Sequence, residues 1–168
     1  MKTSILSEHY QTNIIKITTL LFIAFFWVSI QNVYAAGAPA KTGMTATEKR
    51  KNANVNFEKG LKLQEAGNYK EASKKYEKAV EADNTYAEAW SNLGFTYRKQ
   101  GDFDKAVKAY KKAIKLSPNL AEAHEYLGEA YAEMGKLDLA EKELNILREL
   151  GSHEADELED FIAKSKAK

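Results

Sequence analysis

Apolar side chains recur at helical spacing in residues 87–120, and they form two stripes separated by a short polar break. The first stripe falls at positions i, i+3, i+4 and i+7, which places its members on one face of an α-helix: Trp90, Leu93, Gly94 and Tyr97. The second stripe follows the break at residues 101–102 and repeats at three and four: Phe103, Ala106, Val107, Tyr110, Ala113 and Ile114. Pro118 cannot continue a helix interior, so the second helix ends before it. The stretch predicts a helix hairpin.

The hairpin pattern occurs three times, because one constant step along the chain maps it onto the segments before and after it. Several positions keep their character in this register: Gly60, Gly94 and Gly128; Gly67, Gly101 and Gly135; Ala72, Ala106 and Ala140; Tyr76, Tyr110 and Leu144. Glycine costs about 1 kcal/mol in a helix interior relative to alanine. A glycine that recurs inside successive helices therefore predicts a close contact between helices.

The repeat resembles the tetratricopeptide repeat family, whose pattern of Trp, Leu-Gly, Tyr, Ala, an aromatic residue and Pro is present in the middle copy: Trp90, Leu93, Gly94, Tyr97, Ala106, Tyr110 and Pro118. The resemblance covers about residues 53–154. It implies an all-α fold, a right-handed superhelix (solenoid) of three helix hairpins whose concave groove binds peptide segments. We expect the first repeat at 47–86 with an N-terminal helix extension, the others at 87–120 and 121–154, and a capping helix and tail at 155–168.

Residues 1–35 have the features of a secretion signal. Lys2 and Lys16 lie before an apolar run at residues 17–30, and small residues favour cleavage after Ala35. The run is shorter than the roughly 20 residues of a spanning helix, but extension across Lys16 would make it an uncleaved membrane anchor, and this alternative stays open. We expect an exported bacterial protein in the periplasm, or one anchored to the membrane and facing the periplasm.

The sequence also predicts where the first helix of the repeat region begins and how its last repeat is capped. After a flexible leader at 36–46, Thr45 and Glu48 fit a capping box at the start of a first helix that runs to about residue 66. In that helix Asn56 and Lys59 replace the Trp and Leu of the family pattern, which leaves its register the least defined. A terminal repeat needs a cap. An apolar stripe at 158–162 predicts a capping helix from about 153 to 163, followed by a frayed tail.

The sequence contains no pattern that indicates catalysis. There is no cysteine, so disulfides and thiolate chemistry are excluded. His124 and His153 lie on different elements without partners at metal-ligand spacing, and we interpret His124 as a packing residue. Neither a glycine-rich phosphate loop nor a serine with histidine and carboxylate partners is present. We therefore expect no catalytic residue, no cofactor, no metal and no enzyme activity. The aromatic stripe is interpreted as core, and the alternative is a cofactor or sugar platform.

Charge is distributed unevenly over the repeats. Residues 87–120 have seven basic and three acidic side chains, whereas residues 121–154 have three basic and nine acidic side chains. Several lysines share one face of the second helix of the middle repeat: Lys105, Lys108, Lys112 and Lys115. We interpret this face as solvated, with nucleic-acid binding as the rejected alternative, because the protein has almost no net charge and the lysines lack interleaved aromatics. The opposed charges leave self-association, head to tail, as a possibility.

The family resemblance places a binding groove on the first helix of each hairpin, on a face turned away from the packing stripe. The candidate residues on that face are Phe57, Leu61, Ser91, Asn92, Phe95, Arg98, Lys99, Glu122, Glu125, Glu129 and Glu133. Some family members bind carboxylate tails through a basic clamp, but here only Asn92 matches that clamp, so this specificity is not expected.

The composition of the candidate groove predicts the chemistry of its partner. We expect a protein or peptide segment with an apolar anchor over the three apolar candidates and with Lys or Arg residues facing the four glutamates. Asn92 would hydrogen-bond the backbone of that segment. The alternative for Phe57, Leu61 and Phe95 is that they pack against their own neighbouring helices.

Overall fold

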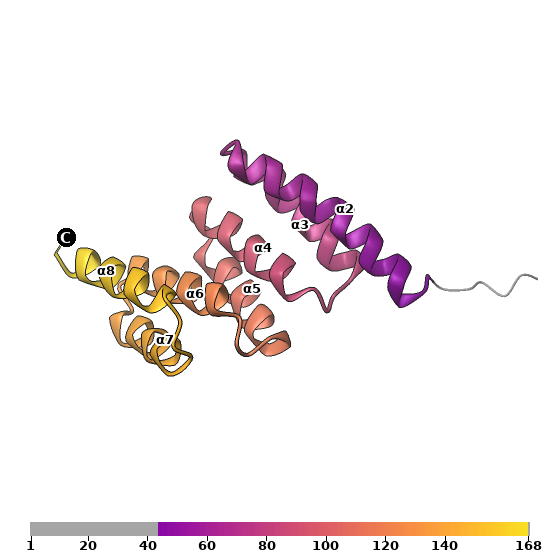
Figure 1. The fold of residues 1–168 in the computed structure, drawn as a ribbon. Helices are drawn as coiled ribbons and strands as arrows, with labels where there is room; N and C mark the ends of the chain where they lie inside the picture. The colour runs from indigo at the N-terminus through magenta and orange to yellow at the C-terminus, as the bar shows by residue number, and fades with distance from the viewer. Residues whose placement is uncertain (1–43, 168) are drawn as a thin grey trace, which may run out of the picture. The chain divides into compact units, whose positions relative to one another are not determined.

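The computed structural model describes residues 44–167, and the predictions for residues 1–35 and for most of the leader lie outside this range. Within it the chain forms seven α-helices and no strand (Figure 1). In chain order they are α2 (Ala46–Glu65), α3 (Tyr69–Ala82), α4 (Ala87–Lys99), α5 (Phe103–Leu116), α6 (Ala121–Glu133), α7 (Leu137–Glu149) and α8 (Glu154–Lys166). None of these helices combines the length and the apolar character that are needed to cross a bilayer.

Successive helices pair into three hairpins, α2 with α3, α4 with α5, and α6 with α7. The hairpins stack in chain order, since α3 packs on α4 and α5 packs on α6, while α8 packs on α6 and α7 (Figure 1). The first helices α4 and α6 also touch each other. Each hairpin therefore contacts its sequence neighbours, as in a repeat protein, and the predicted all-α architecture with a C-terminal helix is confirmed.

A glycine in the left-handed region makes each hairpin turn. At Gly101 φ is +80°, and the amides of Gly101 and Asp102 donate to Arg98 O and Tyr97 O, each at 2.9 Å. These bonds satisfy carbonyl groups that the end of α4 leaves free. The glycines one repeat earlier and later have the same conformation. The recurrence of glycine at this position is thus a backbone requirement.

The glycines inside α2, α4 and α6 lie against large side chains. A Cβ atom on Gly94 would lie 2.6 Å from Cε1 of Tyr110, and Gly60 has the same relation to the tyrosine of α3. At Gly128 the neighbour is Leu158 of α8. The predicted close contacts are confirmed, and the structure adds that the contact is made by a side chain of the packed helix. In the third repeat α8 supplies the bulk that a tyrosine supplies in the other two.

The packing stripes form two buried clusters. One cluster joins α3 and α4, and partly buried side chains of α2 pack against it. Its buried members are Ala72, Tyr76, Ala79, Val80, Ala89 and Leu93. The other extends over α5 to α8 and includes Tyr110, Leu127, Tyr131, Leu144, Leu147, Leu158 and Ile162. Trp90 and Tyr97 pack against the first cluster, and Trp90 Nε1 donates to Asn84 O at 3.1 Å. The interpretation of the aromatic stripe as core is therefore confirmed.

The departures of the first repeat are explained by its position. Ala89 and Leu93 of α4 are buried against α3, but their equivalents in α2, Val55 and Lys59, are exposed, Val55 by 49%. No described helix precedes α2, so this face meets solvent and polar side chains are tolerated on it. Thr45 accepts from Glu48 N and completes the predicted capping box.

The C-terminal helix is longer than the sequence predicted. Leu158 and Ile162 are buried and Phe161 is half-buried, as expected for a capping helix. The prediction that residues beyond 163 fray is wrong as far as Lys166. Ser165 Oγ donates to Phe161 O at 2.9 Å, and Lys166 Nζ lies 2.8 Å from Glu141 Oε1 of α7. These two contacts hold the last turn against the repeat.

Candidate functional site

The residues of α4 that were predicted to line the groove differ widely in exposure. Ser91 is fully buried, so it does not belong to a surface that a partner could reach. Asn92 is also buried; its Nδ2 donates to Glu88 O at 3.1 Å, and its Oδ1 accepts from the Tyr76 hydroxyl at 3.4 Å. The amide expected to bond a partner's backbone is therefore already engaged. Phe95 is half-buried, and Lys99 is exposed.

Arg98 joins α4 to α6 and is not a free cation. Its side chain is only 3% exposed and forms ion pairs with Glu129, through Nη2 and Oε2, and with Glu133, where Nη1 and Oε1 are 2.9 Å apart. The guanidinium carbon also lies 5.6 Å from the centre of the Phe95 ring. Burial lowers the pKa of Arg98, but the nearby carboxylates outweigh this effect and hold the group charged. Three predicted groove residues thus form ion pairs with one another.

An aromatic row lies across this region. Phe95 is 6.1 Å from Tyr69 and 5.2 Å from Tyr126 between ring centres, and Tyr126 is 6.2 Å from Tyr110. Lys99 Nζ lies 5.1 Å from the centre of the Phe95 ring. Sequence reasoning placed Phe95 in the groove but missed Tyr69 and Tyr126 as its neighbours. Their proximity depends on how α3, α4 and α6 stack, and spacing along one helix does not reveal it.

Phe57 and Leu61 lie in a different environment from Phe95. The Phe57 ring is 5.6 Å from Tyr76 and 4.9 Å from Tyr86, and both Phe57 and Leu61 pack against the first core cluster. The three apolar candidates are therefore not one continuous patch. Of the two interpretations, packing against neighbouring helices describes Phe57 and Leu61, whereas Phe95 belongs to neither cluster.

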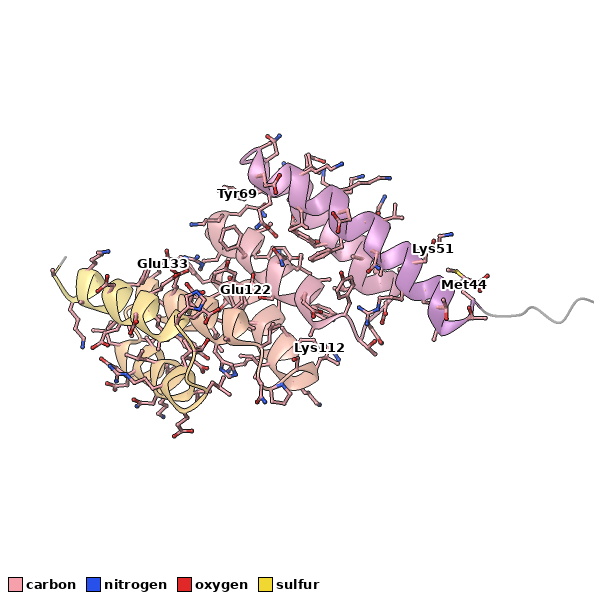
Figure 2. The ribbon with its side chains drawn as sticks, viewed as in Figure 1. Met44, Lys51, Tyr69, Lys112, Glu122 and Glu133 are labelled. Carbon is pink, nitrogen blue, oxygen red and sulfur yellow. The ribbon has the colours of Figure 1, made fainter. Side chains whose placement is uncertain are left out.

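The four candidate glutamates of α6 separate into two groups. Glu129 and Glu133 face Arg98, whereas Glu122 and Glu125 have no ion pair with a cation in residues 44–167. Glu122 and Glu133 lie near the two ends of α6 (Figure 2). Burial raises the pKa of Glu122. Burial, and next the negative charges of Glu129 and Glu157, raise the pKa of Glu125 to about 8.

Helix α8 adds further carboxylates to this end of the molecule. Glu125 is only 7% exposed, and its carboxyl group is within hydrogen-bonding reach of Glu157 in α8. His153 Nδ1 lies 3.1 Å from Glu154 Oε2, and the same ring extends toward Glu157. The sequence identified α8 as a cap, and the structure makes it one wall of the acidic region.

For the rest of the text, the groove face means Phe95 and Lys99 of α4, Glu122, Glu125, Tyr126, Glu129 and Glu133 of α6, and Tyr69 of α3. A hollow of 330 Å³ lies elsewhere, between the start of α2 and the turn after α3. Asp83, which lines it, accepts from Thr85 Oγ1 and pairs with Arg50 Nε of α2 at 2.7 Å. That hollow therefore serves the packing of the first hairpin.

His124 is buried, as expected of a packing residue, and it also fixes polar contacts. Nδ1 lies 2.7 Å from Glu143 Oε2 of α7, and Nε2 lies 2.9 Å from Pro118 O. Bonding to Glu143, which outweighs burial, raises the pKa of His124. Among the described residues, no group of three or more His, Cys, Asp or Glu side chains has an arrangement suited to a metal ion.

The family model described as TPR repeat matches residues 60–101 and 96–135, which include most of the first two hairpins and the helix α6. The matched residues include Gly60, Gly94 and Gly128, and in the structure each of these glycines lies against a large side chain of a packed helix. The chain belongs to the tetratricopeptide repeat (TPR) family. Among curated proteins no sequence matches this TPR chain.

Several solved structures have the same fold. The first TPR of Spaghetti (RPAP3), bound to the HSP90 peptide SRMEEVD, is 29% identical, with a TM-score of 0.63 over 71% of this chain and 96% of that chain. MamA is 28% identical, with a TM-score of 0.54 over 67% of this chain and 61% of that chain. The translocator chaperone SycD of Yersinia enterocolitica is 16% identical, with a TM-score of 0.63 over 70% and 93%. The last comparison supports the fold alone.

Proposed function

We propose that this TPR protein is a non-enzymatic adaptor that binds a segment of a partner protein against the groove face. The observation that carries the proposal is the aromatic row of Tyr69, Phe95 and Tyr126, in which Phe95 stays half-buried although it belongs to neither core cluster. A partly exposed aromatic ring among polar helices offers an apolar anchor point. The peptide-bound structure of the first TPR of Spaghetti supports the same mode of action.

The contacts of the candidate residues suggest where the apolar and the basic residues of the partner segment would lie. The apolar anchor belongs over Phe95, because Phe57 and Leu61 are committed to the core of the first hairpin. Basic residues of the partner belong opposite Glu122 and Glu125, because Arg98 already neutralises the other two glutamates of α6. Such a segment combines one buried contact with charge complementarity at its end.

A phage-displayed library of random peptides, selected on the immobilised full-length protein, tests the proposal. We expect enriched sequences that share an apolar residue and that bind the Phe95→Ala variant much more weakly at any ionic strength. Lys108→Ala is the matched control, because Lys108 is exposed on α5, outside the groove face. A failure to enrich any sequence, or equal loss with both variants, would sink the assignment.

We further propose that the protein acts outside the cytoplasm and that residues 1–35 are a cleaved signal. The support is the sequence: a charged start, an apolar run at residues 17–30 and small residues before position 36. The protein recovered from its native cells should begin at Ala36 when its N-terminus is sequenced. A protein that retains Met1 and sediments with membranes would mean that the segment is an anchor.

A second candidate function is self-association. The observation that favours it is the charge difference between residues 87–120, with four more basic than acidic side chains, and residues 121–154, with six more acidic than basic. Opposite charges attract only weakly on a solvated surface at physiological salt. The polar outer face of α2 offers little apolar area to such an interface, so we rank self-association second.

A further inference from the structure

Glu125 is a buried carboxyl group that pairs with no cation in the described chain. The residue is 7% exposed, and within residues 44–167 it forms no ion pair with Lys, Arg or His. After burial itself, the negative charges of Glu129, Glu157 and Glu154 are what raise its pKa. A carboxylate that is removed from water without a cation is unfavourable, so the fold gains nothing from this arrangement.

The equivalent residue of the preceding repeat shows what packing alone requires. Ser91 of α4 occupies the position of Glu125 one repeat earlier and is fully buried. The two helices have similar surroundings, because α4 packs on α6 and α6 packs on α8. A small uncharged side chain therefore suffices at this position when another helix covers it. The carboxyl group of Glu125 needs a reason other than stability.

The surroundings of Glu125 are acidic on both packed helices. From α6, Glu122 and Glu129 face the same region, and Glu129 is held by Arg98 and lies near Lys99 of α4. From α8, Glu154 and Glu157 face it, with His153 beside both. His153 is 79% exposed on its side chain, and it is the only basic group that the described part of α8 and its N-cap present there. The carboxyl groups around Glu125 thus have cations of their own nearby, Arg98 and Lys99 at Glu129 and His153 at Glu154 and Glu157, but none of these pairs with Glu125.

We propose that Glu125 and Glu157 form a site between α6 and α8 that binds one Lys or Arg side chain of the partner segment. The inference rests on the proposed function of the groove face and names the residue type that the site selects. A cationic side chain would supply the missing counter-charge and make charge-assisted hydrogen bonds to both carboxylates. The buried, unpaired carboxyl group of Glu125 distinguishes this site from an ordinary acidic surface.

Binding at this site is coupled to the release of a proton. With a pKa of about 8, Glu125 holds its proton at neutral pH in the free protein and hydrogen-bonds Glu157. An incoming ammonium or guanidinium group favours the ionised form, so the proton leaves for solvent as the cation arrives. Affinity should consequently rise with pH between about 6 and 8, by at most about tenfold per pH unit.

The experiment uses a synthetic peptide from the random-library selection described above, and a matched peptide in which norleucine replaces its Lys or Arg. Norleucine keeps an apolar stem and removes the charge. Calorimetry at neutral pH in phosphate and in Tris buffer, which differ in ionisation enthalpy, counts the protons released. We expect the basic peptide to bind about tenfold or more tightly than the norleucine peptide and to release a proton.

Two variants separate the site from the rest of the molecule. Glu125→Gln keeps the shape of the side chain and should lose both the preference for the basic peptide and the proton release. Glu125→Ser, which introduces the residue type of Ser91, should show the same two losses. Glu149→Gln is the control, because Glu149 is an exposed carboxylate on α7 of the same repeat. Circular dichroism checks that each variant is folded.

The possible failures are distinct. If peptides bind and require Phe95 but show no preference for a basic residue, or if Glu125→Gln still releases a proton, the Glu125–Glu157 site is wrong and the groove function stands. If no peptide binds at all, the proposed function itself is wrong, and this inference falls with it.

Discussion

At the scale of single residues, packing explains some of the helix positions of this protein and fails to explain others. Gly94 is set by packing, because the Tyr110 ring fills the space that a side chain would need. Glu125 is buried where packing asks for a small neutral residue, as Ser91 shows. The first position contributes to stability, and the second costs stability.

Gly94→Ala tests the packing assignment. Alanine is favoured over glycine in a helix by about 1 kcal/mol, but the added Cβ would lie 2.6 Å from Tyr110, which is fully buried and cannot move aside. We expect a net loss of about 1 to 2 kcal/mol in the free energy of unfolding, measured by denaturant titration. Adding Tyr110→Leu, the residue type of the third repeat, should recover part of the loss. A more stable Gly94→Ala protein would contradict the contact.

Glu125→Gln tests the cost of the buried carboxyl group. Its pKa rises from 4.5 to about 8 on folding, so the folded chain binds more protons than the unfolded chain between these values. The free energy of unfolding of the native protein should therefore fall as pH rises through this window. The variant lacks this titration, and relative to the native protein it should gain about 2 kcal/mol between pH 5 and pH 8, allowing for solvent screening.

Urea titrations at several pH values measure this difference. Comparing two proteins is necessary because His124, whose pKa is raised, also contributes stability that is lost as pH rises. Glu149→Gln, at an exposed position of α7, is the control for the loss of a carboxyl group. Parallel curves for the native and Glu125→Gln proteins would show that Glu125 titrates as an exposed carboxyl group.

At the scale of helices, Arg98 is the polar link between the second and third hairpins. Its ion pairs with Glu129 and Glu133 connect α4 to α6, and its side chain is nearly inaccessible. A buried ion pair adds little net stability over apolar residues of the same shape, but removing one partner leaves a buried charge uncompensated. The link therefore fixes how the two hairpins meet.

Arg98→Ala should destabilise the protein by about 3 kcal/mol, because Glu129 then remains buried without its cation. Combining it with Glu129→Gln should restore part of that stability, since the stranded charge is removed. Lys99→Ala, at the exposed neighbouring position, should cost less than about 0.5 kcal/mol. A double-mutant cycle by thermal or urea unfolding measures the coupling, and additive losses would place the two side chains apart.

The elements themselves were predictable from local patterns, and their pairwise contacts were not. The constant repeat step, the turn glycine at Gly101 and the stripe that ends in Ile162 define the helices from the sequence alone. The burial of Ser91 and the ion pair of Arg98 with Glu129 depend on how one hairpin is rotated against the next. Spacing fixes which side chains of one helix are neighbours, whereas packing decides which side chains of two hairpins meet.

At the scale of the whole repeat region, the two terminal hairpins differ in what covers their outer faces. The C-terminal end is covered by α8, which buries Leu158 and Ile162. At the other end the equivalents of buried α4 residues are polar or exposed in α2, with Lys59 in place of Leu93. Neither end presents the broad apolar face that the stacking of another repeat would require.

The protein should consequently be a monomer, and this is the prediction that separates an adaptor from a self-associating module. Attraction between the basic middle repeat and the acidic third repeat acts over a surface in water, where each pair contributes at most about 1 kcal/mol and salt screens it. Specific interfaces also need about 1,000 Å² or more of well-packed area. Sedimentation should give one mass over a wide range of concentration, at low and at physiological salt. If instead the mass grows with concentration and salt reverses the growth, the charges join copies of this chain, and the acidic end that we assign to a partner's lysine or arginine would be occupied by the chain's own basic repeat.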